Sequence, residues 1–184
     1  MRCIWSIFLL LTIAGKLYSA ESNNCGANTY ENDPSLFSLL TGYFHVMYTT
    51  NGVLDNEIIR FDVTGNDTIY ARTTNDGECC RTFNITFGKD YNPYYIGSDD
   101  DCTTKVSDSG QIKLLASFTD NDGSICYISW GCRETRHNVH ANCDKRELSL
   151  QQKLWIYGQF IWRRLPIIEV NQTADYENGK CFDN

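Results

Sequence analysis

Short segments in which apolar and polar residues alternate, separated by turn-forming residues, most strongly constrain how this chain can fold. In one of them Ile59, Phe61 and Val63 would lie on one face of an extended strand. Such segments are rich in Ile, Val, Phe, Tyr and Thr, which favour strands. The Asn, Asp and Gly residues between them tolerate the positive φ that tight hairpins require. The pattern predicts an all-β meander.

Eight strands are expected in this meander. They span residues 41–49, 57–63, 67–73, 79–87, 102–106, 111–118, 124–132 and 151–159. A short helical turn is expected over residues 34–40, and a second short helix is an option after Pro166. The sheet must close on itself or pack against a second sheet, because open edges promote aggregation. An up-and-down barrel and a sandwich both satisfy this requirement.

The N-terminus has the pattern of a secretory signal peptide. Arg2 precedes an apolar run over residues 3–14, which is shorter than the roughly 20 residues that span a bilayer. Small residues beyond this run offer cleavage points, so we expect a signal peptide over residues 1–20 and one domain over residues 21–184. An uncleaved anchor is the alternative. The expected location is extracellular, without a membrane-spanning segment.

The cysteines and glycosylation motifs fit an oxidising compartment. Of nine cysteines, only Cys3 lies in the signal peptide, and the even number left predicts four disulfides with no free thiol. The eight are Cys25, Cys79, Cys80, Cys102, Cys126, Cys132, Cys143 and Cys181. Cys79 and Cys80 would point to opposite faces of a strand, so they need different partners. Three sequons predict glycans on Asn66, Asn84 and Asn171.

Motifs of enzymatic chemistry are missing from the sequence. It contains no nucleophile elbow, phosphate-binding loop or zinc-protease motif, so no enzymatic activity is expected. The formal net charge of −7 argues against nucleic-acid binding. Zinc-ligand types do gather at Cys132, His137, His140 and Cys143, but their spacing matches no familiar finger. Disulfides are the expected state of these cysteines, so neither a metal nor a cofactor is predicted.

Three motifs, in order along the chain, resemble the lipocalin family. Residues 39–44, LLTGYF, place a glycine just before an aromatic residue at the start of the first strand. Residues 114–127 resemble the family's Thr-Asp-Tyr hairpin between the sixth and seventh strands. Residues 154–159, LWIYGQ, resemble the aromatic end of the last strand, which closes on an arginine. The likeness is nearest to apolipoprotein D and secreted arthropod lipocalins.

The motifs depart from the family pattern at three positions. Tyr43 replaces the usual tryptophan, Asn121 stands at the tyrosine of the hairpin, and Gln159 stands at the arginine. In lipocalins that arginine packs across the first-strand aromatic residue at the closed end of the barrel. The resemblance therefore implies a contact between Tyr43 and Arg163 or Arg164, and two surface arginines are the alternative.

The resemblance implies an all-β fold, an eight-stranded antiparallel up-and-down barrel (calyx) with a short N-terminal helical turn. It also implies a secreted protein, a monomer or weak oligomer, that sequesters or carries a small hydrophobic or amphipathic molecule in a central cavity. The alternative is a secreted disulfide-rich β-domain that acts through protein–protein contacts without a cavity ligand.

Strand alternation gives candidates for the wall of this cavity. If Tyr43 points into the base of the barrel, the residues two and four positions later also point inward. A glycan on Asn84 must face water, which turns its two neighbours inward. The expected wall residues are His45, Met47, Phe61, Phe83, Ile85, Leu114 and Ile128.

Overall fold

The computed structural model describes residues 30–51, 58–65, 68–75, 79–87, 93–99, 108–133 and 136–170. Two helices lie within these ranges, the 3-10 helix η2 (Pro34–Leu39) and the α-helix α2 (Leu150–Trp162). The strands are β1 (Gly42–Thr49), β2 (Ile58–Gly65), β3 (Thr68–Asn75), β4 (Cys79–Phe87), β5 (Pro93–Asp99), β6 (Asp108–Thr119), β7 (Ile125–Arg133), β8 (Arg136–Cys143) and β9 (Ile168–Glu169). No helix in the described ranges is long and apolar enough to cross a membrane.

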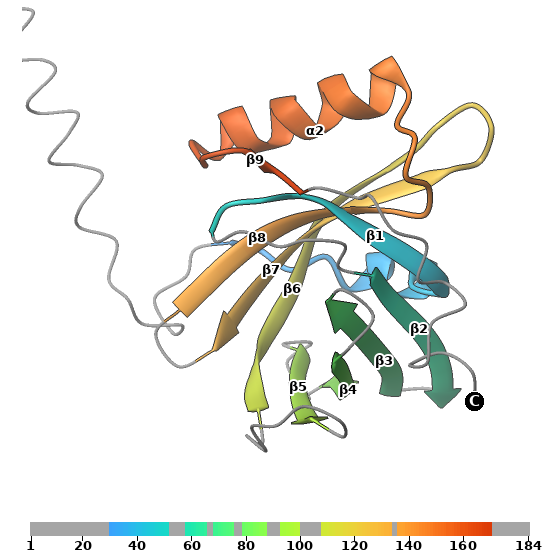
Figure 1. The fold of residues 1–184 in the computed structure, drawn as a ribbon, viewed down its shortest axis with the longest axis vertical. Coiled ribbons are helices and arrows are strands. Elements are labelled where there is room, and N and C mark those ends of the chain that lie inside the picture. Colours follow the sequence, from blue (N-terminus) through green and yellow to red (C-terminus); the bar gives the residue numbers. More distant parts are fainter. Residues whose placement is uncertain are drawn as a thin grey trace, which may run out of the picture.

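The first eight strands form a closed antiparallel barrel (Figure 1). Each strand from β1 to β8 pairs with the next one in the sequence, and β8 pairs back with β1. Short β9 adds to the other part of β1, where Tyr48 lies opposite Glu169. The predicted up-and-down barrel is therefore confirmed over the sandwich. The expected helical turn near the N-terminus is also present, as η2.

Six of the predicted strands correspond to β1, β2, β3, β4, β6 and β7. The predicted strand over 102–106 lies outside the described residues. Strands β5 and β8 were not predicted. The residues after Pro166 form β9 rather than a second short helix, and the Val170 amide donates to the Met47 carbonyl (2.9 Å).

The predicted strand over 151–159 is wrong, because these residues belong to α2. Ser149 caps the helix: its hydroxyl accepts from the Gln152 amide (3.1 Å), and the Gln152 side chain accepts from the Ser149 amide (2.9 Å). Gln152, Ile156 and Phe160 then recur every four residues and form the buried face. The aromatic and β-branched residues that suggested a strand thus occupy an amphipathic helix.

The hairpin between β6 and β7 forms where the Thr-Asp-Tyr resemblance placed it. The Asp120 amide donates to the Ser124 carbonyl (2.8 Å), and the Gly123 amide donates to the Asp120 carbonyl (3.0 Å). Gly123 has a φ of 83°, a conformation that glycine adopts without steric cost. The local sequence therefore determines this turn.

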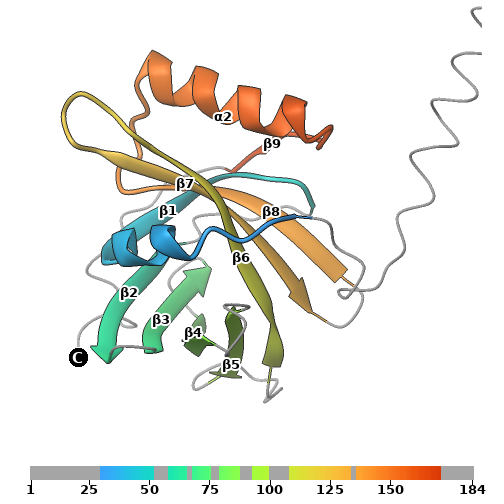
Figure 2. The same cartoon turned by 180° about the vertical axis from the view of Figure 1, so that it is seen from behind.

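Buried apolar side chains form two separate clusters. The interior cluster consists of Phe37, Leu40, Phe44, Phe61, Ile85, Leu114 and Tyr127. The helix cluster consists of Met47, Tyr48, Cys126, Ile128, Trp130, Cys132, Val139, Ala141, Cys143, Ile156 and Phe160. Figures 1 and 2 show α2 along the outside of the barrel and η2 away from it, beside β1 and β2. The two clusters therefore lie on opposite sides of the β7–β8 sheet.

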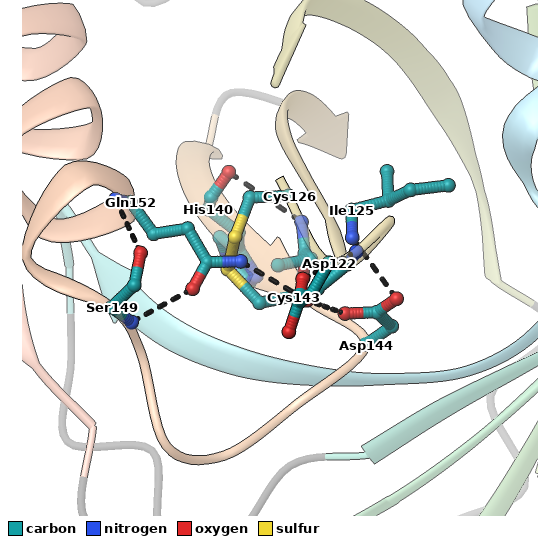
Figure 3. Close-up of a disulfide and its surroundings, with 10 residues drawn as sticks. Asp122, Ile125, Cys126, His140, Cys143, Asp144, Ser149 and Gln152 are labelled. Carbon is teal, nitrogen blue, oxygen red and sulfur yellow. Dashed lines mark hydrogen bonds between the residues drawn. A yellow bond between two sulfur atoms is a disulfide. The ribbon is translucent and has the colours of Figure 1, made fainter. Parts of the chain in front are cut away.

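A disulfide joins Cys126 on β7 to Cys143 on β8, directly opposite each other in the sheet (Figure 3). Cys132 is also disulfide-bonded. The two cysteines among the zinc-ligand types, Cys132 and Cys143, are therefore both disulfide-bonded, as the sequence predicts. The side chains of Cys79 and Cys80, together with Cys25, Cys102 and Cys181, lie outside the described residues, so their disulfides stay predictions.

A polar network fixes the start of α2 to the β6–β7 hairpin (Figure 3). The side-chain NH₂ group of Gln152 donates to the Ser124 hydroxyl (3.0 Å), which in turn donates to the Asp144 carboxylate. The other carboxylate oxygen of Asp144 accepts from the Ile125 amide (3.0 Å). Because Gln152 and Ser124 are buried, these bonds satisfy polar groups that would otherwise be costly to desolvate.

Asn84 is the one sequon asparagine within the described residues. Its side chain is exposed, whereas that of the next residue, Ile85, is buried. This is the orientation that a glycan at Asn84 requires, and glycosylation itself stays a prediction. Asn66 and Asn171 lie outside the described residues.

Candidate functional site

The interior of the barrel is the candidate site, and its floor is the interior cluster. Side chains from β1, β2, β4, β6 and β7 can meet only across the interior, because these strands stand around a closed ring. The Phe44 ring lies 5.0 Å from the Tyr127 ring and 5.8 Å from the Phe61 ring, measured between centroids. Both pairs are edge-to-face, a favourable geometry for aromatic rings.

Helix η2 closes the barrel at the end where β1 begins. Its Phe37 and the following Leu40 belong to the interior cluster. The segment before the helix is tied to the middle of β6: the Asp33 amide donates to the Leu114 carbonyl, and the Leu114 amide donates to the Asn32 side chain, both at 2.9 Å. The closed end is therefore apolar and held in place by one backbone hydrogen bond and one hydrogen bond to the Asn32 side chain.

The inner surface of β7 and β8 is polar, in contrast to the floor. Residues directly opposite on neighbouring antiparallel strands share a face of the sheet. Ser129 lies opposite Leu114, and Asn142 lies opposite Tyr127, two members of the interior cluster. Ser129 also lies opposite His140. Ser129, His140 and Asn142 therefore face the interior, and we call them the polar wall.

Alternation along β8 explains this arrangement. Val139, Ala141 and Cys143 belong to the helix cluster on the outer face, beneath α2. The residues between them, including His140 and Asn142, must then face inward. The strand thus presents its apolar residues to the helix outside and its polar residues to the interior, the reverse of the usual arrangement in a small soluble barrel.

Asn142 is the most deeply buried member of the polar wall, with 0% of its surface exposed. Its amide NH₂ donates to the Ser129 hydroxyl (3.0 Å) and to the His140 carbonyl (3.5 Å). Its carbonyl oxygen Oδ1 is also buried and has no hydrogen-bond partner among the described residues. The interior therefore contains an acceptor that the described protein groups leave unsatisfied.

Burial lowers the pKa of His140 to about 4 from an ordinary value of 6.5. Desolvation disfavours the charged imidazolium, so the imidazole is neutral near pH 7. A neutral imidazole donates from one nitrogen and accepts at the other. Part of the residue nevertheless remains accessible, as it does for Ser129.

The end of the barrel opposite η2 is held by contacts between β8 and the end of β1. The Asn51 amide group donates to the His137 carbonyl (2.8 Å) and to the Asn138 side chain (3.0 Å). The Val139 amide donates to the Thr50 hydroxyl (3.0 Å). This end therefore has a polar rim on the β1–β8 side.

Three of the predicted wall residues, Phe61, Ile85 and Leu114, lie together in the interior cluster. The side chain of Phe83, on β4, lies outside the described residues. A role of any of these residues in ligand binding stays a prediction.

The structure corrects the positions of three other predicted wall residues. His45 lies opposite Ile58 and Cys143, on the face away from Phe44, because Phe44 rather than Tyr43 points inward. A register shift in β1 between Val46 and Tyr48 then places Met47 in the helix cluster. Ile128 also lies in the helix cluster, because its neighbour Tyr127 faces the interior.

Tyr43 packs with a different arginine from the expected one. The Arg60 guanidinium lies over the Tyr43 ring, 5.5 Å from its centroid, and donates to the hydroxyl (3.4 Å). Arg163 instead follows α2, where it donates to the Gln159 side chain and lies 4.7 Å from the Trp162 ring. The expected contact with Arg163 or Arg164 fails because residues 151–159 are helical, which moves both arginines to the outside of the barrel.

Sequence reasoning missed the polar wall. No strand was expected over residues 136–143, RHNVHANC, where only zinc-ligand residue types were noted. The signal was the alternation of Val139, Ala141 and Cys143 with polar residues, which predicts a strand with one apolar face. The packing of this apolar face against a helix could not be inferred, because the helix itself was predicted to be a strand.

Known structures share this fold, although sequence comparison finds no relative. No family model matches the chain, and no curated protein sequence is similar to it. Apocrustacyanin C2 matches with a TM-score of 0.55 at 10% identity, over 86% of this chain and 95% of its own. Lobster apocrustacyanin A1 matches with a TM-score of 0.57 at 12% identity, over the same shares. The tryptamine complex of the Rhodnius prolixus amine-binding protein matches with a TM-score of 0.57 at 11% identity, over 79% of this chain and 88% of its own.

Proposed function

We propose that this chain, which has the lipocalin fold, is a secreted protein that sequesters or carries one small, largely apolar molecule inside its barrel. The observation that carries the proposal is the interior itself. An apolar floor that includes Phe61 and Leu114 adjoins a polar wall on β7 and β8. Ligand sites in proteins combine apolar lining with a few well-placed polar groups in this way.

The floor would supply affinity and the wall would supply orientation. Contact with aromatic and aliphatic side chains removes apolar ligand surface from water, which is favourable. The neutral polar groups of Ser129, His140 and Asn142 would hold hydrogen-bonding groups of the ligand without the cost of burying a charge. The tryptamine complex among the structures with this fold supports a small molecule as the kind of ligand.

Secretion is supported by the oxidised cysteines. The Cys126–Cys143 disulfide and the disulfide at Cys132 are the state expected outside the reducing cytosol. The signal-like residues 1–20 lie outside the described residues and agree with this location.

Uptake of N-phenyl-1-naphthylamine, a neutral dye that fluoresces in apolar surroundings, tests the proposal. We expect the oxidised full chain to bind the dye saturably, with one molecule per chain. Ser129→Phe would fill the interior with an apolar ring, so we expect it to abolish uptake. Ser38→Phe is the matched control, because Ser38 is exposed on η2 and its hydroxyl donates to the nearby Ser35 carbonyl.

Thermal unfolding of each variant shows that it is folded before uptake is compared. Unchanged dye binding by folded Ser129→Phe would contradict the proposed site. Absence of saturable binding to the unmodified chain would contradict the proposed function without any variant.

A second candidate function, interaction with another protein through the outer surface, is favoured by one observation. Helix α2 exposes Leu150, Leu154, Ile161 and Trp162, each by more than 60% of its surface. Exposed apolar side chains grouped on one element often mark an interaction surface. A chain that binds no dye but is otherwise folded would favour this candidate.

A further inference from the structure

We propose that Asn142 determines specificity, and that the ligand is a neutral molecule carrying a hydrogen-bond donor, such as a hydroxyl or an N–H group, which binds to Asn142 Oδ1. This inference rests on the proposed function, since it assumes that a ligand enters the barrel. It adds the chemical class of that ligand and the residue that selects it.

The unsatisfied oxygen of Asn142 is the first observation. The residue is fully buried, and Oδ1 accepts no hydrogen bond from the described residues. Buried polar groups in native proteins are nearly always hydrogen-bonded, and an exception calls for an explanation such as a ligand. Oδ1 is buried on the inner face of β8, so a molecule in the barrel would supply the missing donor by displacing the neighbouring side chains that cover the oxygen.

The neighbours of Asn142 fix which end of its amide faces the ligand. The NH₂ group donates to the Ser129 hydroxyl and to the His140 carbonyl. Rotating the amide by 180° would bring Oδ1 against that carbonyl, and two acceptors cannot form a hydrogen bond. The His140 carbonyl therefore keeps the NH₂ group on its own side and leaves the acceptor available to the ligand.

The charges around Asn142 select a neutral donor. On β7 and β8, the inward-facing residues whose side chains are described include no aspartate or glutamate. An ammonium group bound to Oδ1 would find no counter-charge among these residues, and burying an unpaired charge is costly. A carboxylate has no donor to offer and would be repelled by Oδ1. An alcohol, a phenol or a neutral N–H group meets the requirement, and His140 can make a second hydrogen bond in either direction.

Three naphthalenes of similar shape test this inference by calorimetric titration of the oxidised full chain. 2-Naphthol carries a donor, 2-methoxynaphthalene keeps the oxygen but has no donor, and 2-methylnaphthalene has neither. Because 2-naphthol is the most polar of the three, simple partition into an apolar interior would favour the others. We expect it instead to bind roughly tenfold tighter than the methyl ether, because the ether leaves Oδ1 without a partner.

Asn142→Leu removes the acceptor with little change in volume. In this variant we expect 2-naphthol and its methyl ether to bind within about twofold of each other, with binding of the ether retained. Asn121→Leu, on the exposed β6–β7 turn, is the matched control and should keep the full preference.

The outcomes separate this inference from the proposed function. If the unmodified chain binds all three compounds but does not prefer 2-naphthol, the inference is overturned while the binding function stands. Failure of all three to bind would contradict the proposed function and the inference with it. The comparison on the unmodified chain decides the inference even if Asn142→Leu does not fold. A preference for 2-naphthol that survives in folded Asn142→Leu would also overturn it.

Discussion

At the scale of single residues, His140 and Asn142 show how strand alternation can place polar chemistry inside a barrel. Both face the interior from β8, while the residues between and beside them pack under α2. Burial holds His140 neutral, and the cost of charging it links the stability of the barrel to pH.

Acid should destabilise the barrel through His140. Its pKa is about 4 when folded and near 6.5 when unfolded, so between these values the unfolded chain binds a proton that the folded chain does not. Stability should therefore fall as the pH drops from about 6.5 to 4. We expect protonation of His140 to lower the free energy of unfolding, measured in urea, by about 1–2.5 kcal/mol between pH 7 and pH 4.5.

The variant His140→Gln isolates this contribution, because glutamine keeps hydrogen-bonding capacity but does not titrate in this range. We expect its loss of stability between pH 7 and pH 4.5 to be smaller than that of the unmodified chain. The other titrating groups are common to both proteins and cancel in the difference. An equal loss in both proteins would show that His140 is not the group responsible.

At the scale of elements, the main error of sequence reasoning concerned α2. The run LWIYGQ is aromatic and β-branched, which favours a strand, yet Ser149 and Gln152 form a helix cap at the start of the segment. Tertiary packing of Ile156 and Phe160 on the outer face of β7 and β8 completes the helix. The cap was visible in the sequence, whereas the surface that receives the helix was not.

The bond between Gln152 and Ser124 should hold α2 on the barrel. We expect Gln152→Ala to lower the free energy of unfolding by about 1–3 kcal/mol, because it removes a helix cap and leaves the buried Ser124 hydroxyl with one partner fewer. Gln151→Ala is the control, since Gln151 is exposed at the neighbouring position of α2. Equal stability of the two variants in urea would count against the network.

At the scale of the whole molecule, some inward-facing positions of the barrel could be predicted from the sequence, but the pairing that closes the barrel could not. Alternation around Phe61 and Ile85 identified two inward positions, because each lies in a regular strand. It failed for Met47, because the irregularity after Val46 changes the phase of β1 and no residue pattern marks it. It also could not show that β1 pairs with both β8 and β2, which depends on contacts far apart in the chain.

Locating a bound molecule by NMR tests the central claim, that the interior is the binding site. The chain offers matched methyl reporters: Ile85 and Leu114 are buried in the interior cluster, and Ile161 and Leu154 are exposed on α2. Titration with 2-naphthol should shift the methyl signals of Ile85 and Leu114, together with the side-chain amide signals of Asn142. The signals of Ile161 and Leu154 should not move. Shifts confined to these two α2 residues would contradict the account and place binding on the outer surface.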